Sequence, residues 1–448
     1  MYLKSLRLEN IACFEELDLD FTDENGEPCK WVVLLGENGV GKSHILYSII
    51  GSIWSMGAHE YIRDESYPGK ISPDFVVTKD DLWREEKKEI SFSKIYYAKG
   101  SEIFNFENIS REELFRFSML MTNSSNEGFY LGAYGGYSHA SSSQRASSFF
   151  VSELDLPQHK DRIISIFGRN EYLTEIDEWF ADLDFSILKI NDELSKNEFS
   201  LKKRLDLESN LNLFEKKMRL SKESLGKILP RSVRFLEVTV DRKVVFLDHG
   251  KEVFFENLST GYKSTIIWII DLVRRLVESF EMSDPLLASG IVLVDEIDLH
   301  LHPRWQRTIV QKIRDTFPNL QFIVTSHSPF VAQDMTEKDK IIVLTRDGDK
   351  VTARQEKGFV KGWRADQILT SWLFGLETTR DEEIESLEKE RRIGLQRDEE
   401  NLLTDTERQE LDQVTQELEA MRSSDVAPDR QKLEAAAALV MELMSKTL

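Results

Sequence analysis

The sequence predicts an α/β fold around a parallel sheet, with a helical insertion and an all-helical C-terminal region. The first observation is the run Ile291-Val292-Leu293-Val294, which is short, apolar and mostly β-branched, and which leads directly into two acids. Such a run is typical of a strand that is buried on both faces of a parallel sheet. The second observation is an apolar strand pattern at 31–35, followed by a glycine-rich segment and an apolar helix pattern at 44–54. Strands alternating with helices in this way predict the α/β class.

The glycine-rich segment matches a phosphate-binding loop. It is the complete pattern G-x-x-x-x-G-K-[S/T] and consists of Gly36, Glu37, Asn38, Gly39, Val40, Gly41, Lys42 and Ser43. The glycines allow backbone N–H groups to close around phosphates, and the helix that follows adds its dipole. We expect Lys42 to reach the β- and γ-phosphates of ATP, and the Ser43 hydroxyl to bind Mg²⁺. A chance match is the alternative, and the flanking strand and helix argue against it.

The two acids after the apolar run, Asp295 and Glu296, form the second candidate site. Ligands bind at the carboxyl ends of the strands in open parallel sheets. An unpaired buried charge is costly, so paired acids at such a strand end need a partner, and Mg²⁺ together with a water molecule would serve. Two solvated acids are an equally good interpretation of this segment alone. The phosphate loop upstream favours the metal site.

The composition limits the classes of function. The chain has 448 residues, enough for two or three domains, and a formal net charge of -21. The sequence pI is about 5.0. This acidity argues against nucleic-acid binding through the overall charge of the chain, although it is compatible with a local basic groove.

Cysteine usage and hydropathy predict a cytoplasmic protein with no membrane partner. The two cysteines, Cys13 and Cys29, are too few for a disulfide framework or a zinc cluster. Residues 1–8 alternate in polarity, unlike a signal peptide. The most apolar stretch, 266–273, contains Asp271 and is too short to cross a bilayer.

Shifts in pattern along the chain predict four parts. The first part carries strand patterns at 2–8, 17–21, 31–35, 90–98 and 129–134, and an otherwise poor pattern between 56 and 155. A charged helical stretch follows, whose apolar spacing sustains no heptad register and so argues against long coiled-coil arms. A solvated helical hairpin is its default interpretation, and a lever that docks a partner is the alternative. The predicted parts are 1–154, 155–230, 231–362 and 363–448.

Two further segments in the third part are candidate phosphate contacts. After strands within 233–256, Ser259 can cap a helix that runs to Val277, and Gly261 allows close backbone approach. A simple N-cap and a helix N-terminus aimed at a phosphate are both consistent with this segment. Another buried strand pattern ends at Ser326 and His327. Because His327 would lie on the same sheet edge as the acids, we favour a functional role over a structural one.

The order of these motifs resembles a known family. The phosphate loop, 258–262, 294–296, Asp298 and His327 together resemble ABC-type ATPases of the SMC and RecF branch. The fold implied is a P-loop NTPase of the ABC/SMC-head type. Within that branch, the chain resembles AAA-type ATPases of bacterial anti-phage systems, of the kind found in Septu (PtuA) and in retrons. The segments that carry this second resemblance are 298–303, 325–329, 362–371 and 374–376.

The resemblance implies roles for individual residues. Asp295 would hold Mg²⁺, Glu296 would act as the general base, and His327 would sense the γ-phosphate. Ser259 and Gly261 would touch the γ-phosphate bound by a second subunit, with Asp298 at the same interface. The site would therefore be shared across a homo-oligomer.

One departure from the family pattern concerns Lys263. The family signature usually reads LSGGQ-like, whereas Tyr262 and Lys263 follow Gly261 here. A lysine close to the phosphates would strengthen nucleotide binding. This departure leaves open whether ATP is hydrolysed or only bound. The usual Q-loop glutamine is not identified, although Gln144 is present in the poorly patterned region.

No nuclease domain is evident in the sequence. Asp347-Gly348-Asp349 favours a hairpin turn over a metal site, and His300 and His302 have no obvious third ligand. The C-terminal region is helical instead, with helix-starting capping boxes at 379–382 and 404–407. An apolar stripe and a third helix complete it, at Leu411, Val414, Leu418, Met421 and from Pro428 onward. An internal packing face is the default interpretation of the stripe, and a docking surface for a partner protein is the hypothesis for this region.

The sequence therefore predicts an ATP-binding and hydrolysing subunit of an anti-phage complex. It would assemble on nucleotide and regulate a separate nuclease subunit, of the HNH type if the system is Septu-like, with DNA contacted through the complex. The alternatives are a RecF-like DNA repair ATPase and a poorly hydrolysing, ATP-bound scaffold.

Overall fold

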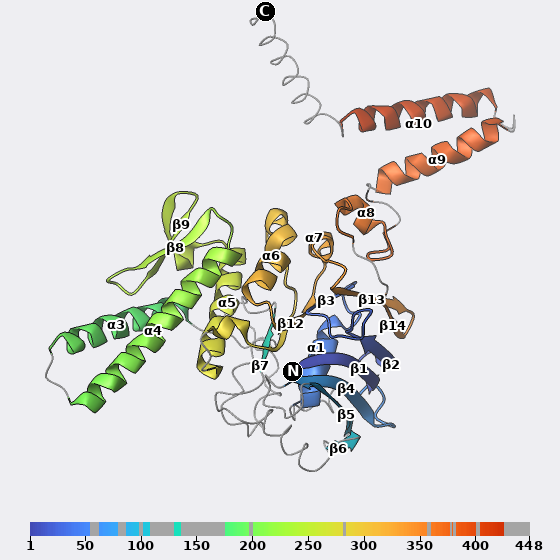
Figure 1. Ribbon diagram of the computed structural model, residues 1–448. Coiled ribbons are helices and arrows are strands. Elements are labelled where there is room, and N and C mark those ends of the chain that lie inside the picture. The colour runs from blue at the N-terminus through green and yellow to red at the C-terminus, as the bar shows by residue number, and fades with distance from the viewer. Residues whose placement is uncertain are drawn as a thin grey trace, which may run out of the picture. The chain divides into compact units, whose positions relative to one another are not determined.

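The computed structural model of the chain divides into two compact units (Figure 1). Unit 1 comprises Met1–Ile368 and Trp372–Phe374, and unit 2 comprises Leu369–Ser371 and Gly375–Leu448. The structure describes residues 1–53, 62–78, 87–97, 102–107, 130–135, 175–196, 200–280, 284–355, 360–376, 379, 382–399 and 404–424. The predicted boundary between 154 and 155 and the glutamine at position 144 lie outside the described residues.

A mostly parallel sheet of six strands forms the centre of unit 1. Its strand order is β14-β13-β3-β12-β11-β7, and only β14 is antiparallel to its neighbour. The predicted α/β class is therefore confirmed, and both apolar runs that predicted it are buried strands of this sheet. The bounds are β3 (Trp31–Gly36), β7 (Tyr130–Tyr134), β11 (Gly290–Val294), β12 (Leu320–Thr325), β13 (Lys340–Asp347) and β14 (Lys350–Arg354).

Alternate residues of the central strands enter two separate hydrophobic clusters, because successive side chains of a strand point to opposite faces. In β3, Val32 and Leu34 belong to one cluster, and Trp31, Val33 and Leu35 to the other. The first cluster also contains α1 (Lys42–Ile53) and an antiparallel sheet. The second contains α4 (Leu201–Ile228), α5 (Thr260–Ser279) and α6 (Pro303–Thr316). In Figure 1, α1 and α6 lie on opposite sides of the central strands.

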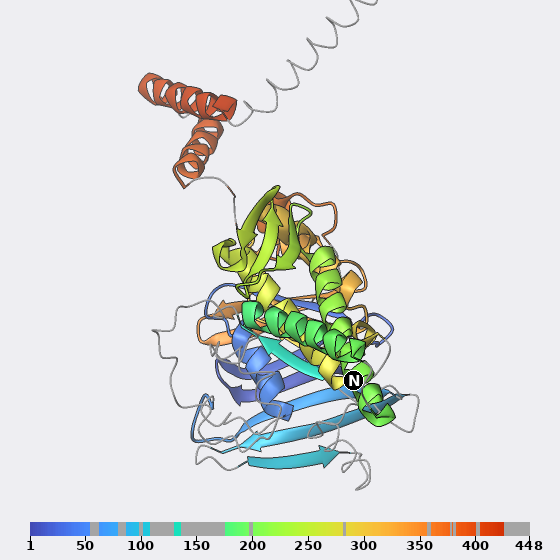
Figure 2. The same ribbon diagram turned by 90° about the vertical axis from the view of Figure 1, so that its left-hand side faces the viewer.

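The antiparallel sheet has the order β2-β1-β4-β5-β6 and appears as the blue and cyan strands at the bottom of Figure 2. The sequence predicted β1, β2 and β5 but not β4 and β6. Gly69, Pro73 and Asp74 lie within β4, and such residues are depleted in strands. Pro73 pairs with Leu6 of β1. The pairing of β4 with β5 goes from Ile71 directly to Asp74 and does not include Pro73, so a proline is tolerated at this position. The bounds are β1 (Tyr2–Ile11), β2 (Phe14–Asp20), β4 (Gly69–Thr78), β5 (Lys87–Tyr96) and β6 (Glu102–Glu107).

The predicted helical insertion contains a pair of helices, α3 (Ile176–Ser195) and α4. It is followed by three short antiparallel strands, β8 (Val233–Val238), β9 (Val244–Asp248) and β10 (Lys251–Phe254). The end of α4 is held by α6. Lys312 Nζ donates to the carbonyl oxygens of Ile228 and Leu229 at 3.0 and 2.6 Å, and Trp305 Nε1 donates to Ile228 at 3.3 Å.

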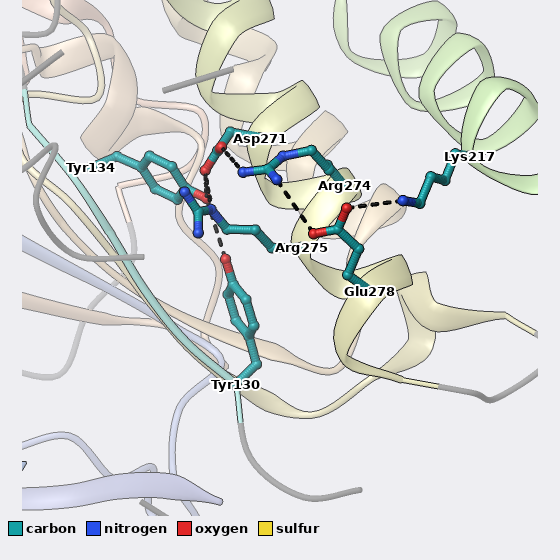
Figure 3. Close-up of polar contacts among 7 residues, drawn as sticks. All are labelled: Tyr130, Tyr134, Lys217, Asp271, Arg274, Arg275 and Glu278. Carbon is teal, nitrogen blue, oxygen red and sulfur yellow. Dashed lines mark hydrogen bonds and ion pairs between the residues drawn. The ribbon is translucent and has the colours of Figure 1, made fainter. Parts of the chain in front are cut away.

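A buried ion pair on α5 joins this helix to the edge strand β7 (Figure 3). Arg275 Nε lies 2.5 Å from Asp271 Oδ2, and both side chains are almost fully buried. The Tyr134 hydroxyl donates to the same carboxylate at 3.2 Å. Asp271, the charge that interrupts the apolar helix pattern, is therefore paired. Toward solvent, Arg274 pairs with both Asp271 and Glu278, and Lys217 of α4 pairs with Glu278 at 2.9 Å.

Short helices complete unit 1. They are η6 (Phe255–Asn257), η7 (Pro285–Leu287), α7 (Pro329–Gln333) and α8 (Ala365–Leu369), and the last residue of α8 belongs to unit 2. No helix in the described parts of the chain is both long and apolar enough to span a bilayer.

Unit 2 contains two helices, α9 (Glu382–Glu399) and α10 (Asp405–Ser424). The capping box predicted at the start of α10 is confirmed, since Thr404 and Glu407 exchange hydrogen bonds between side chain and amide. The two helices approach closely, because a Cβ atom at Gly394 would lie 2.6 Å from Leu411. The predicted third helix, from Pro428, and the side chains of the rest of the stripe beyond Val414 lie outside the described residues.

Candidate nucleotide-binding site

The phosphate loop connects the end of β3 to the start of α1. Gly39 and Gly41 have φ angles of 80° and 93°, a region that favours glycine. A Cβ atom at Gly41 would lie 2.5 Å from Cys13 Sγ, so the loop also packs tightly against the β1–β2 turn. The amides of Lys42 and Ser43 lie in the first turn of α1, where no carbonyl of the helix can accept from them. These features together suit the loop backbone to binding an anion.

Lys42 is buried beneath this loop. Its Nζ donates to the carbonyl oxygens of Gly36 and Glu37, both at 2.8 Å. Burial lowers the pKa of Lys42, while the nearby carboxylates, first that of Asp295, act in the opposite direction. The ammonium group is therefore held inside the loop by carbonyl oxygens and by negative charge, at the position from which it would meet phosphate oxygens.

The Asp295 carboxylate links the phosphate loop to the end of β11. Ser43 Oγ donates to Asp295 Oδ2 at 2.7 Å, and Thr325 Oγ1 donates to Asp295 Oδ1 at 2.6 Å. Thr325 ends β12, Asp295 follows β11, and Ser43 lies at the start of α1 after β3. The parallel order β3-β12-β11 brings these three strand ends side by side. The prediction that Ser43 and Asp295 share one site agrees with this contact between residues 252 positions apart.

Glu296 has a left-handed backbone with φ 54°, unusual for a residue other than glycine. Its amide donates to Thr325 Oγ1 at 2.7 Å, which fixes the turn after β11. Partial burial, and then the negative charges of Asp295 and Asp298, raise the pKa of the Glu296 carboxyl group. Such a carboxylate is a stronger proton acceptor than a free one, as a general base requires.

His327 and Asp298 flank these acids. Partial desolvation and the charge of Lys42 lower the pKa of His327, which keeps the exposed imidazole neutral at pH 7. The Oδ1 atom of Asp298 is buried and accepts no hydrogen bond from any residue that the structure describes. A buried oxygen without a donor normally indicates a missing partner.

The start of α5 has contacts within its own chain. Ser259 caps the helix by accepting from the Tyr262 amide, as predicted. A Cβ atom at Gly261 would lie 2.3 Å from the His300 carbonyl oxygen, so the glycine is required for packing against the turn after β11. Lys263 Nζ donates to the Glu256 carbonyl at 3.1 Å. The described hydrogen bonds of Ser259 and Lys263 do not reach the phosphate loop, and a role of these residues at a second subunit stays a prediction.

The Asp347-Gly348-Asp349 segment and His302 have structural explanations. Asp347-Gly348-Asp349 is the predicted hairpin turn between β13 and β14. His302 Nδ1 accepts from the Arg304 amide and caps α6. Among the described residues, no group of three or more histidine, cysteine or acidic side chains is arranged to hold a metal ion.

Two functional positions were not identified from the sequence. Thr325 orients Asp295 and Glu296 together, and the Tyr134 carbonyl accepts from the Asp295 amide at 2.8 Å. A threonine that ends an apolar strand just before Ser326 and His327 was the available signal for the first. Nothing in the sequence indicated the second, because it depends on β7 pairing with β11.

The side chains present fit MgATP. The positive φ angles of the loop glycines and the first amides of α1 suit phosphate oxygens. Ser43 and Asp295 converge through oxygen atoms, the donors that Mg²⁺ prefers. The donor-free Asp298 Oδ1 also indicates that the site takes a further group.

Comparison with known proteins finds one matching family and several similar chains. The family described as "AAA domain, putative AbiEii toxin, Type IV TA system" matches residues 123–332. A retron Vc95 probable ATPase of Vibrio cholerae is 29% identical over 385 residues, covering 75% of this chain and 73% of the relative. A Septu protein PtuA of Bacillus mycoides is 26% identical over 393 residues, covering 84% of this chain and 45% of the relative.

The chain spans less than half of this PtuA relative. Among solved structures, an Smc head bound to the C-winged helix domain of ScpA has a TM-score of 0.49 and 15% identity, and the match covers 80% of this chain and 98% of that one. The resemblance inferred from the motifs is confirmed: the chain is a homologue of Septu PtuA and of retron-associated probable ATPases, and the AAA domain family matches its residues 123–332.

Proposed function

We propose that the chain binds MgATP at the end of β3 and hydrolyses it, and that nucleotide controls its assembly. The observation that carries this proposal is the contact between Ser43 of the phosphate loop and Asp295 of β11, with Glu296 as the next residue. A phosphate site, two oxygen donors for a metal ion and a carboxyl group with raised pKa thereby lie at one edge of the sheet.

Each residue would have a separate task. The loop amides and Lys42 would hold the β- and γ-phosphates, while Ser43 and Asp295 would hold Mg²⁺. When bound, Mg²⁺ would neutralise part of the phosphate charge and so favour attack at phosphorus. Glu296 would accept the proton of the attacking water, and neutral His327 would donate a hydrogen bond to the γ-phosphate.

The site would be completed by a second copy of the chain. Ser259 is exposed at the N-terminus of α5, a 20-residue helix, and Lys263 lies in its first turn. A helix N-terminus and an ammonium group are suited to a γ-phosphate held by a partner copy. Gly261 would bring the helix backbone close, and Asp298 would meet the partner at the same interface. The chain would then form a homo-oligomer in the presence of ATP.

The assembled ATPase would regulate a separate nuclease subunit in anti-phage defence. The support is homology to retron and Septu ATPases. Binding energy from ATP would order the shared interface, and hydrolysis would release it. The chain would be cytoplasmic, and DNA would be contacted through the complex.

Lys42→Ala and Glu296→Gln test the nucleotide part. Lys42→Ala should abolish ATP binding in calorimetry, because the loop loses its cation. Glu296→Gln should bind ATP but lower turnover by at least about a hundredfold, and trap the oligomer in size-exclusion chromatography. Wild-type assembly and turnover in both variants would contradict the mechanism.

Co-purification tests the partner. The tagged chain, expressed with its neighbouring genes, should retain a nuclease whose activity responds to ATP in the wild type and not in Lys42→Ala. A homodimer that forms with ATP, binds DNA with steep salt dependence and retains no nuclease would instead favour a DNA repair ATPase.

A further inference from the structure

The tip of the phosphate loop is held from outside by an arginine that belongs to none of the recognised motifs. Arg346 lies near the end of β13, and its guanidinium donates to the Gly39 carbonyl oxygen at 3.1 Å. The proposed function assigns this residue no task.

Strand register explains how Arg346 reaches the loop. Leu344 of β13 pairs with Gly36, the last residue of β3, and a Cβ atom at Gly36 would lie 2.5 Å from the Leu344 carbonyl oxygen. From this point β3 turns into the phosphate loop, whereas β13 continues. Arg346 lies two residues further along, about 7 Å, and on the same face of the strand as Leu344. The side chain therefore extends over the loop.

A second contact acts on the next peptide of the loop. Cys13, in the turn between β1 and β2, donates from Sγ to the Val40 carbonyl at 3.5 Å. Arg346 lies close enough to Cys13 for its charge to oppose the effect of burial, which raises the pKa of the thiol. The Gly39 carbonyl thus accepts from Arg346 on β13, and the Val40 carbonyl accepts from Cys13 in the β1–β2 turn.

The direction of these carbonyls determines the direction of the amides. In a trans peptide the C=O and the following N–H point in opposite directions. Holding the Gly39 and Val40 carbonyls outward therefore turns the amides of Val40 and Gly41 to the other side. The positive φ angles of Gly39 and Gly41, on either side of Val40, suit successive amides that converge on one anion.

We propose that Arg346 is a positioning residue that presets the phosphate loop by holding the Gly39 carbonyl outward, with Cys13 in support at Val40. Arg346 acts on the β-phosphate through the loop amides rather than by touching the nucleotide. This inference rests on the proposed ATP binding.

The test compares the affinities of three Mg²⁺-loaded probes, ADP, ATP and inorganic tripolyphosphate, by calorimetry. Each carries a phosphate equivalent to the β-phosphate. Arg346→Ala should weaken all three by the same factor, about tenfold, as expected for one charge-assisted hydrogen bond. Arg346→Lys should recover most of the loss, because the ammonium group retains a donor. The thermal midpoint without nucleotide should not change, since Arg346 is exposed.

Lys350→Ala is the matched control. It removes one positive charge from the same hairpin, two residues from the turn glycine Gly348, without a described contact to the loop. Its affinities should equal those of the wild type. The Arg346→Ala loss should also persist at about 0.5 M salt, where a purely long-range charge effect is screened.

Other patterns would overturn the inference. A greater loss for ATP and tripolyphosphate than for ADP would mean direct contact with the γ-phosphate. Unchanged tripolyphosphate binding would mean contact with the base or ribose, and equal binding of all probes would mean no role. A wild-type chain that binds none of the probes would instead reject the proposed ATP site itself.

Discussion

At the residue scale, the site is a cluster of three carboxylates around one buried cation. The Asp295 carboxylate accepts hydrogen bonds from the hydroxyl groups of Ser43 and Thr325, whereas the described hydrogen bonds of Glu296 involve its backbone. Partial burial and the two neighbouring aspartates, Asp295 and Asp298, therefore raise the pKa of Glu296 above its ordinary value of 4.5. A site with unbalanced negative charge is less stable without its ligand than a neutralised one.

The charge on Glu296 should destabilise the nucleotide-free chain above the raised pKa. A carboxyl group whose folded pKa is raised binds its proton more tightly in the folded state, so stability increases as the pH falls through that pKa. Glu296→Gln should therefore raise the thermal midpoint at pH 7.5, by about 1–2 °C. The difference from the wild type should shrink as the pH approaches 4.5.

Differential scanning fluorimetry across this pH range measures the effect. Glu252→Gln, on the exposed strand β10, controls for loss of one charge from a chain of net charge -21. A midpoint difference that is independent of pH, or equal in the two variants, would contradict the assigned cause.

At the element scale, α5 connects the candidate interface to the sheet. Its N-terminus packs against the turn after β11 through Gly261. Its middle carries the buried pair of Asp271 and Arg275, which Tyr134 of β7 completes (Figure 3). The Tyr134 carbonyl in turn holds the Asp295 amide. The helix is therefore joined to the acidic strand end at two points.

Loss of one partner of the buried pair should be costly. Asp271→Asn leaves the Arg275 guanidinium buried without its counter-charge, and should lower the free energy of unfolding by about 3–5 kcal/mol. Lys217→Met removes the ion pair to Glu278, whose side chain is 41% exposed. It should change the free energy of unfolding by less than about 1 kcal/mol.

Urea unfolding, followed by tryptophan fluorescence, compares the two variants. Similar midpoints for Asp271→Asn and Lys217→Met would show that burial does not set the strength of these pairs.

At the scale of the whole molecule, both hydrophobic clusters consist of unit 1 residues. The furthest buried member along the chain is Leu373. The described helices of unit 2 are α9 and α10, which are joined to each other by the Gly394–Leu411 approach and by ion pairs such as Arg397–Glu407. Among the residues that the structure describes, the apolar burial that stabilises the central fold thus lies before Gly375.

A chain truncated after Gly375 should therefore fold. Its main calorimetric transition should stay within about 2 °C of that of the full chain, because no member of either cluster is removed. It should also bind ATP with unchanged affinity. An aggregated product, or a clearly lower transition, would show that residues beyond Gly375 support the core.

How far the sequence predicted the structure depends on the range of the interaction. The phosphate loop and the strands β3 and β11 were predicted because glycine spacing and short continuous apolar runs are local features of the sequence. β4 was missed because its Gly69 and Pro73 argue locally against a strand, while pairing on both edges outweighs that preference.

The sequence by itself determined that this chain has a phosphate loop, a buried strand ending in two acids, and the motif order of an ABC-type ATPase. Only the tertiary structure decided that Thr325 holds both acids in place, that Gly261 packs against the His300 carbonyl, and that Arg346 reaches Gly39. The physical reason is that a short segment specifies its own backbone, whereas contacts between distant segments depend on strand order and register, which are set by the packing of the whole sheet.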